Sequence, residues 1–134
     1  MGTRAAVAVP VEGGGWRGRY VHWGGNLAPA LRAVLIRDGY ARAVEVLTVD
    51  HDGWSQVTGD PAVELDPDFH DDRFSAVPGY GIAYTEAQWH GGPAEWITPD
   101  TVEDYGVEVV YVLTPDGVAV LDPAHPHTGL RSTP

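Results

Sequence analysis

The side chains best suited to binding or chemistry are concentrated near the N-terminus, between Trp16 and Leu27. From this stretch and the strand before it we select six residues as a candidate ligand-binding site: Arg4, Tyr20, His22, Trp23, Gly25 and Asn26. Asn26 follows two glycines and precedes a run with helical spacing, so we expect its side chain to cap a helix. The N–H groups of a first helical turn attract phosphate or carboxylate, and Arg4 reaches them if the N-terminal strands pair. The sequence therefore predicts a small-anion site here.

The same residues also have a purely structural interpretation. His22 and Trp23 can pack a sheet against the helix while Arg4 pairs with a carboxylate. Both faces of this strand carry aromatic residues, so the pattern alone leaves open which face meets the core. Both interpretations are kept, and the position of Arg4 relative to the helix distinguishes them.

Histidine and carboxylate side chains gather again in the acidic stretch after Asp50. Imidazole and carboxylate groups suit zinc or manganese, so the candidate metal ligands are His51, Asp68, His70 and Asp72. Their spacing matches no metal motif, and we expect solvated acidic loops without a metal or cofactor. The same carboxylates offer His22 an acid–base partner, which would make a small hydrolase or nucleotide-processing enzyme. No nucleophile motif accompanies them, so we favour a non-enzymatic protein.

Charge is divided unevenly along a chain whose net charge is −11. Residues 1–49 hold six Arg and three acidic residues, whereas residues 50–134 hold two Arg and sixteen acidic residues. The acidic part repels a nucleic-acid backbone and permits attraction to a basic protein partner. A stacking patch of Trp16, Arg17, Arg19 and Tyr20 is too small to reverse this, so we expect no direct nucleic-acid binding. The chain has no cysteine, which excludes disulfides and thiolate zinc sites.

Hydrophobic periodicity indicates the elements that must position these residues. Alternation over residues 3–11 and 16–23 predicts a hairpin, and helical spacing predicts helices at about 26–38 and 40–48, with a strand over 43–49 as the competing interpretation. Residues 50–73 are rich in turn formers and are predicted as loops. Strand character returns at 74–85 and 95–97, and two valine-rich runs at 107–113 and 118–121 form a closing hairpin.

These elements predict an α+β fold. Its sheet is mainly antiparallel, is built from the N-terminal and C-terminal hairpins, and packs against one or two helices. We expect a single domain over residues 1–122 and a flexible tail at 123–134. No stretch has the length of a membrane helix and the first residues lack the form of a signal peptide, so we expect a cytoplasmic protein that does not bind membranes. The sequence does not indicate an oligomeric state.

One resemblance adds context. The chain begins Gly2-Thr3-Arg4 and continues, after a strand and a turn, with Tyr20-Val21-His22-Trp23 and Gly25. It resembles a family of small uncharacterised proteins of phages, prophages and actinobacterial genomes that begin Gly-Thr-Arg and carry a His-Trp-Asp-Gly signature. Gly24 stands where that family has Asp. The resemblance implies a phage or mobile-element context and no particular activity.

The hypothesis that joins these observations is a non-enzymatic acidic interaction protein. It would bind either a basic protein partner, through its acidic second half, or a small anion, through the junction near Arg4 and His22. The enzyme described above and a structural component of a larger assembly are the alternatives.

Overall fold

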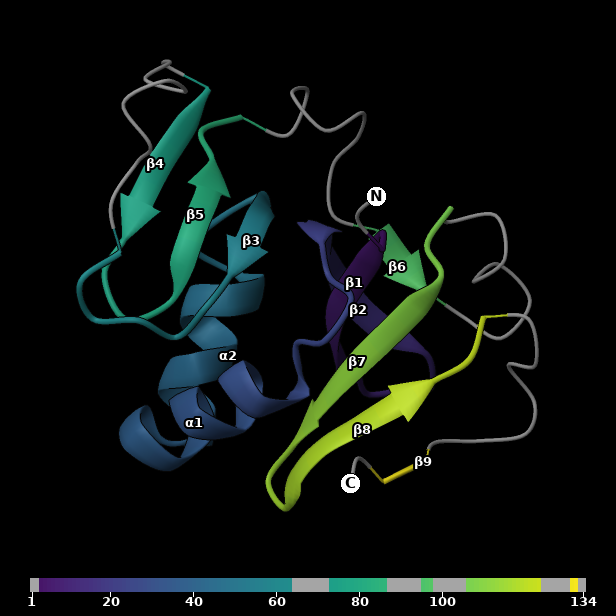
Figure 1. The fold of residues 1–134 in the computed structure, drawn as a ribbon. Helices are drawn as coiled ribbons and strands as arrows, with labels where there is room; N and C mark the ends of the chain where they lie inside the picture. Colours follow the sequence, from purple (N-terminus) through teal and green to yellow (C-terminus); the bar gives the residue numbers. More distant parts are fainter. Residues whose placement is uncertain (1–2, 64–72, 87–94, 98–105, 124–130, 133–134) are drawn as a thin grey trace.

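A computed structural model describes residues 3–63, 73–86, 95–97, 106–123 and 131–132. These residues form a mixed β-sheet with two helices packed on one face, as Figure 1 shows. The predicted α+β fold is therefore confirmed. Nine strands are present among the described residues, in the order β4-β5-β3-β2-β1-β7-β8-β9, and β6 pairs with β2 beside β3.

The N-terminal hairpin has the predicted form. Strand β1 (Ala5–Pro10) pairs antiparallel with β2 (Trp16–Trp23), in a register that places Ala5 opposite Val21 and Pro10 opposite Trp16. The turn between them consists largely of glycine, and Gly13, Gly14 and Gly15 all have positive φ angles, which L-residues with a side chain rarely adopt.

Both predicted helices are present. Helix α1 (Ala28–Asp38) and helix α2 (Tyr40–Thr48) are separated by Gly39, whose φ of 85° breaks the helical path. The region that could have been a strand over 43–49 is thus helical, because Ala43, Val46 and Leu47 bury one helical face against the sheet. No helix among the described residues is long and apolar enough to cross a membrane.

The prediction of loops over residues 50–73 is wrong for its first part. Gly53–Val57 forms strand β3, which pairs parallel with β2, and its second residue, Trp54, is fully buried. The indole N–H of Trp54 donates a 3.0 Å hydrogen bond to the carbonyl oxygen of Leu47 at the end of α2. The predicted strand at 74–85 is a hairpin of β4 (Phe74–Val77) and β5 (Gly81–Tyr84), since Gly79 turns the chain with a φ of 85°.

The C-terminal part supplies β6 (Glu95–Ile97), β7 (Val109–Thr114), β8 (Gly117–Leu121) and β9 (Arg131–Ser132). Strands β7 and β8 form the predicted closing hairpin, and β9 pairs with β8, so part of the predicted flexible tail belongs to the sheet. Most strand pairs are antiparallel as predicted. Two are parallel, β1 with β7 and β2 with β3, because each joins strands separated by long intervening segments.

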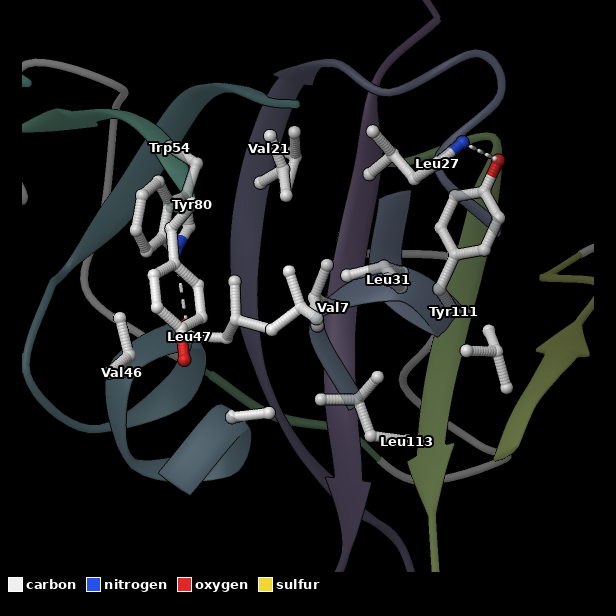
Figure 2. Close-up of a cluster of buried hydrophobic side chains, with 14 of the residues drawn as sticks. Val7, Val21, Leu27, Leu31, Val46, Leu47, Trp54, Tyr80, Tyr111 and Leu113 are labelled. Carbon is white, nitrogen blue, oxygen red and sulfur yellow. Dashed lines mark hydrogen bonds between the residues drawn. The ribbon is translucent and has the colours of Figure 1, made fainter. Parts of the chain in front are cut away.

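The main core lies between the sheet and the helices. Figure 2 shows Val7 and Val21 from the sheet beside Leu31 of α1 and Leu47 of α2, and all four side chains are fully buried. Complete burial of such a side chain stabilises the fold by about 1.5–3 kcal/mol. A second cluster lies on the opposite side of the sheet around Ala6, Ala8, Val110 and Val112, with Trp16 and Tyr20 packed against it. No helix among the described residues belongs to this cluster, and we call this side the helix-free face.

Candidate functional site

The alternation of side chains in β1 and β2 decides which predicted site residues share a surface. Ala5 and Val21 pair with one another and face the helices, whereas Tyr20 packs with Ala6 and Ala8 on the helix-free face. Side chains two residues apart in a strand share a face. Arg4, two residues before Ala6, and His22, two residues after Tyr20, therefore also lie on the helix-free face. The strands do pair near Arg4 as predicted. They carry Arg4 away from helix α1, not toward it.

Arg4, Tyr20 and His22, three of the six predicted residues, share this face. The Tyr20 hydroxyl lies 2.7 Å from Nδ1 of His22, and their rings are 6.0 Å apart between centroids. Burial raises the pKa of Tyr20, while the nearby positive charge of Arg4 lowers it by a smaller amount. Trp23 stands edge-on to His22 at 5.0 Å between ring centroids, and 51% of its surface is exposed.

The helix entrance does not form the predicted anion site. The N-cap residue of α1 is Leu27 rather than Asn26, and no side chain caps it. The buried hydroxyl of Tyr111 takes over this function: it accepts a 3.3 Å hydrogen bond from the Leu27 N–H and donates a 3.0 Å bond to the carbonyl oxygen of Gly24. The dashed line in Figure 2 marks the bond to Leu27. Gly25 and Asn26 are exposed in the turn, where Gly25 lies against the side chain of Thr3.

Gly24 has a structural reason to be glycine. Its N–H donates a 2.7 Å hydrogen bond to the carbonyl oxygen of Thr3, which holds the turn closely against the start of β1. A Cβ atom at this position would overlap the Cβ of Ala5. A larger residue therefore requires either a smaller neighbour or a shift of the backbone.

Arg17 and Arg19 act at the end of helix α2. The Nε of Arg19 donates a 2.8 Å bond to the carbonyl oxygen of Thr48, and Nη2 of Arg17 lies 3.4 Å from the Thr48 hydroxyl. Cations favour the negative end of a helix dipole, so the bond from Arg19 stabilises α2. Trp16 and Tyr20 lie on the opposite face of the sheet. The four residues considered as a nucleic-acid patch therefore do not form one surface.

Of the four candidate metal ligands, the structure describes only His51. Its ring stands against Trp54 at 5.1 Å between centroids, and burial lowers the pKa of its imidazole despite the raising effect of Asp50 and Asp52. Asp68, His70 and Asp72 lie outside the described residues. Within the described ranges, no three His, Asp or Glu side chains are grouped closely enough to hold a metal ion.

The best-defined polar cluster is one that the sequence did not predict. The guanidinium group of Arg37 donates two 2.9 Å bonds to Asp38, through Nε and Nη2, and further bonds to the carbonyl oxygens of Gly59 and Gly79. The Tyr80 hydroxyl donates a 2.6 Å bond to the same carboxylate, and the Arg37 guanidinium lies 5.5 Å from the Tyr80 ring centre. Hydrogen bonds from Arg37 and then Tyr80 lower the pKa of Asp38 to about 2.

This cluster forms one wall of an open groove of about 610 Å³, whose other lining residues are Arg42, Pro61, Pro78 and Gly79. The donors of Arg37 are already engaged with Asp38 and backbone carbonyls, and Arg42 is paired with Glu45 at 2.7 Å. We therefore interpret the cluster as a clamp that joins the end of α1 to the turn before β5. Arg37 and Asp38 are adjacent in the sequence, but Tyr80 is distant from them and contacts Asp38 only in the folded chain.

Comparison with protein-family models, with curated proteins and with solved structures found no match for this chain. The resemblance to phage and actinobacterial proteins therefore stays a prediction.

Proposed function

We propose that this protein is a non-enzymatic binding protein that takes up a small anion on the helix-free face, between Arg4 and His22. The observation that carries the proposal is the joint placement of Arg4, Tyr20 and His22 on one side of the sheet. The predicted partner of this group, the helix entrance, is not part of the proposed site. The site is thus smaller than the sequence suggested.

The contacts of the three side chains favour an anion. Arg4 is exposed, and no ion pair joins its guanidinium to another of the described residues. The Tyr20 hydroxyl bonds with Nδ1 of His22, and in the tautomer in which this hydroxyl is the donor, Nε2 carries the ring proton and can donate to a ligand. A guanidinium and an imidazole N–H side by side provide charge-assisted hydrogen bonds to a phosphate or carboxylate. The half-exposed Trp23 contacts the His22 ring edge-on at the end of β2.

The enzymatic alternative receives no support from these contacts. It requires a carboxylate within hydrogen-bond reach of His22, and among the described residues the side chain found there is Tyr20. Attraction of a basic protein partner remains an alternative that rests on the acidity of residues 50–134. Assembly into a larger structure is the third alternative, and it predicts self-association.

Titration calorimetry with inorganic phosphate and pyrophosphate tests the proposal. We expect binding by the wild-type protein and a loss of at least ten-fold in affinity for Arg4→Ala, with a similar loss for His22→Ala. Arg42→Ala is the matched control, because Arg42 is an exposed arginine on α2 that pairs with Glu45. Equal losses for Arg4→Ala and Arg42→Ala would show a general charge effect and reject the site.

A lysine-rich peptide, tested in parallel, distinguishes the anion site from attraction of a basic partner. Binding of the peptide without binding of either anion would favour the acidic half as the functional surface. Binding of the anions by the wild-type protein and the control, and not by the two site variants, would support the proposal.

A further inference from the structure

The helix-free face carries a row of aromatic side chains that continues beyond Tyr20. Tyr20 pairs with Gly53 of β3. Strands β3 and β5 are antiparallel and pair Trp54 with Ala83, so the next position in this register places Gly53 opposite Tyr84. Tyr84 in turn pairs with Phe74 of β4. Tyr20, Tyr84 and Phe74 therefore lie on one line across the sheet. Gly53, which has no side chain, is the residue between the two tyrosines.

The outer end of this row is organised by ring contacts. Phe74 and Tyr84 lie 5.3 Å apart between ring centroids with their planes inclined by 39°, and the Arg73 guanidinium carbon lies 5.7 Å from the Phe74 ring centre. The rings of Tyr20, Tyr84 and Phe74 are partly exposed, and Arg4 and Arg73 at the two ends are exposed. The row thus combines accessible aromatic rings with a cation at each end.

We infer that the ligand of the proposed anion site is a nucleoside phosphate, with its phosphate at Arg4 and His22 and its base on the aromatic row. This inference rests on the proposed function and adds the chemical class of the ligand. Planar bases stack on aromatic side chains and on arginine, and every base has a π-face that can do so. His22 on β2 and Tyr84 on β5 are separated by two strand spacings and by an offset of two residues along the strand, about 12 Å in all. A nucleoside phosphate spans this separation, whereas an isolated anion does not.

The charges around the row favour a free nucleotide over a nucleic-acid strand. Glu108 lies beside Arg4, to whose carbonyl oxygen its N–H donates a 2.9 Å bond, and Glu86 follows Tyr84 two residues later. The face therefore carries both signs of charge, and the net charge of the chain is −11. A long polyanion would be repelled, so stacking must supply much of the affinity. We expect binding that depends only weakly on salt concentration.

Binding measurements with AMP, ribose 5-phosphate and a ten-residue single-stranded oligonucleotide test this inference. We expect AMP to bind at least ten-fold more tightly than ribose 5-phosphate, which carries the phosphate without the base. Tyr84→Leu and Phe74→Leu remove a ring but keep an apolar side chain, and we expect them to lower the affinity for AMP while leaving that for ribose 5-phosphate unchanged. Tyr40→Leu, on helix α2, is the matched control for loss of an aromatic ring. Thermal unfolding of each variant verifies that it folds.

The outcomes separate the two claims. Equal affinities for AMP and ribose 5-phosphate would overturn the nucleoside ligand and leave the anion site intact. Absence of binding by every phosphate compound would overturn both. Oligonucleotide binding that is tighter than AMP binding and falls steeply with salt would overturn the free nucleotide in favour of a nucleic-acid strand. AMP binding that is lost in Arg4→Ala and weakened in Tyr84→Leu, but not in Tyr40→Leu, would support the inference.

Discussion

Replacement of Asp38 by Asn keeps the shape of the side chain and removes the charge that holds the Arg37 clamp. In the native protein this carboxylate accepts two hydrogen bonds from Arg37 and one from Tyr80. An Asn side chain has one acceptor oxygen in place of two, so at least one of these bonds is lost. The clamp joins α1 to the turn before β5, and we expect its loss to lower the free energy of unfolding of the whole domain.

The pKa of Asp38 provides the magnitude. Its lowering from 3.8 to about 2, at about 1.36 kcal/mol per pKa unit, corresponds to about 2.4 kcal/mol in favour of the charged carboxylate. The side chains of Asp38 and Arg37 are 25% and 38% exposed, so solvent screens part of this interaction. We therefore expect Asp38→Asn to lower the free energy of unfolding by roughly 1–2 kcal/mol at neutral pH.

The effect depends on pH in a defined direction. The pKa of Asp38 is lower in the folded state than in the unfolded state, so its contribution is fully present above the unfolded value of 3.8. It disappears as the pH falls from 3.8 through about 2, because the carboxyl group is then protonated in both states. Asn does not titrate. The difference between the wild-type protein and Asp38→Asn should therefore shrink across this window.

Urea unfolding, followed by tryptophan fluorescence at several pH values between neutral and about pH 2, measures this difference directly. Asp116→Asn is the matched control, because Asp116 is an exposed carboxylate in the turn between β7 and β8. A difference for Asp38→Asn that is the same at both ends of the pH range would refute the electrostatic account of the clamp. So would a neutral-pH difference no larger than that of Asp116→Asn.

Three further substitutions test the packing around the N-terminal hairpin. Gly24→Ala should cost about 1–3 kcal/mol in unfolding free energy because its Cβ overlaps Ala5, and Ala5→Gly in the same chain should restore part of it; a fully stable Gly24→Ala would contradict the close approach. Tyr111→Phe should lower the free energy of unfolding by about 1–3 kcal/mol, because it removes the hydroxyl that bonds both the Leu27 N–H and the Gly24 carbonyl oxygen. Thermal unfolding of this variant that matches the wild type would show that these two bonds do not stabilise the fold. Arg17→Met should leave the free energy of unfolding unchanged or raise it, because the buried Nε of Arg17 has no hydrogen-bond partner among the described residues. Urea unfolding measures this change. A loss above about 2 kcal/mol would show that the contact of Arg17 with Thr48 contributes more than the burial of its charge costs.

Local patterns were sufficient for the elements that bury one regular face. Alternating residues predicted β1 and β2, and the apolar spacing of α2 decided correctly against a strand. Strand β3 was missed because Trp54 and Val57 lie among aspartates and glycines, and only the fold shows that both are buried. The parallel pairs were missed for a related reason: nothing local to β1 indicates that β7 lies beside it.

The structure brings together only some of the residues predicted for the candidate site. Pairing of the strands brought Arg4 to Tyr20 and His22, as the sequence suggested. The role assigned to Asn26 was wrong because Tyr111, distant in sequence, satisfies the helix entrance with its hydroxyl. The contact of Tyr80 with Asp38 and the alignment of Tyr84 with Tyr20 likewise depend on strand order, which the sequence does not contain.

The most direct test of the central claim is a titration of the isotope-labelled protein with AMP, followed by amide and side-chain NMR spectra. The account predicts that the largest shifts map to the helix-free face, at Arg4, Tyr20, His22 and Tyr84. Arg4→Ala should abolish these shifts, and Arg42→Ala should preserve them. Absence of shifts at saturating AMP and at saturating phosphate would contradict the account, as would shifts centred on the groove beside Arg37 and Tyr80.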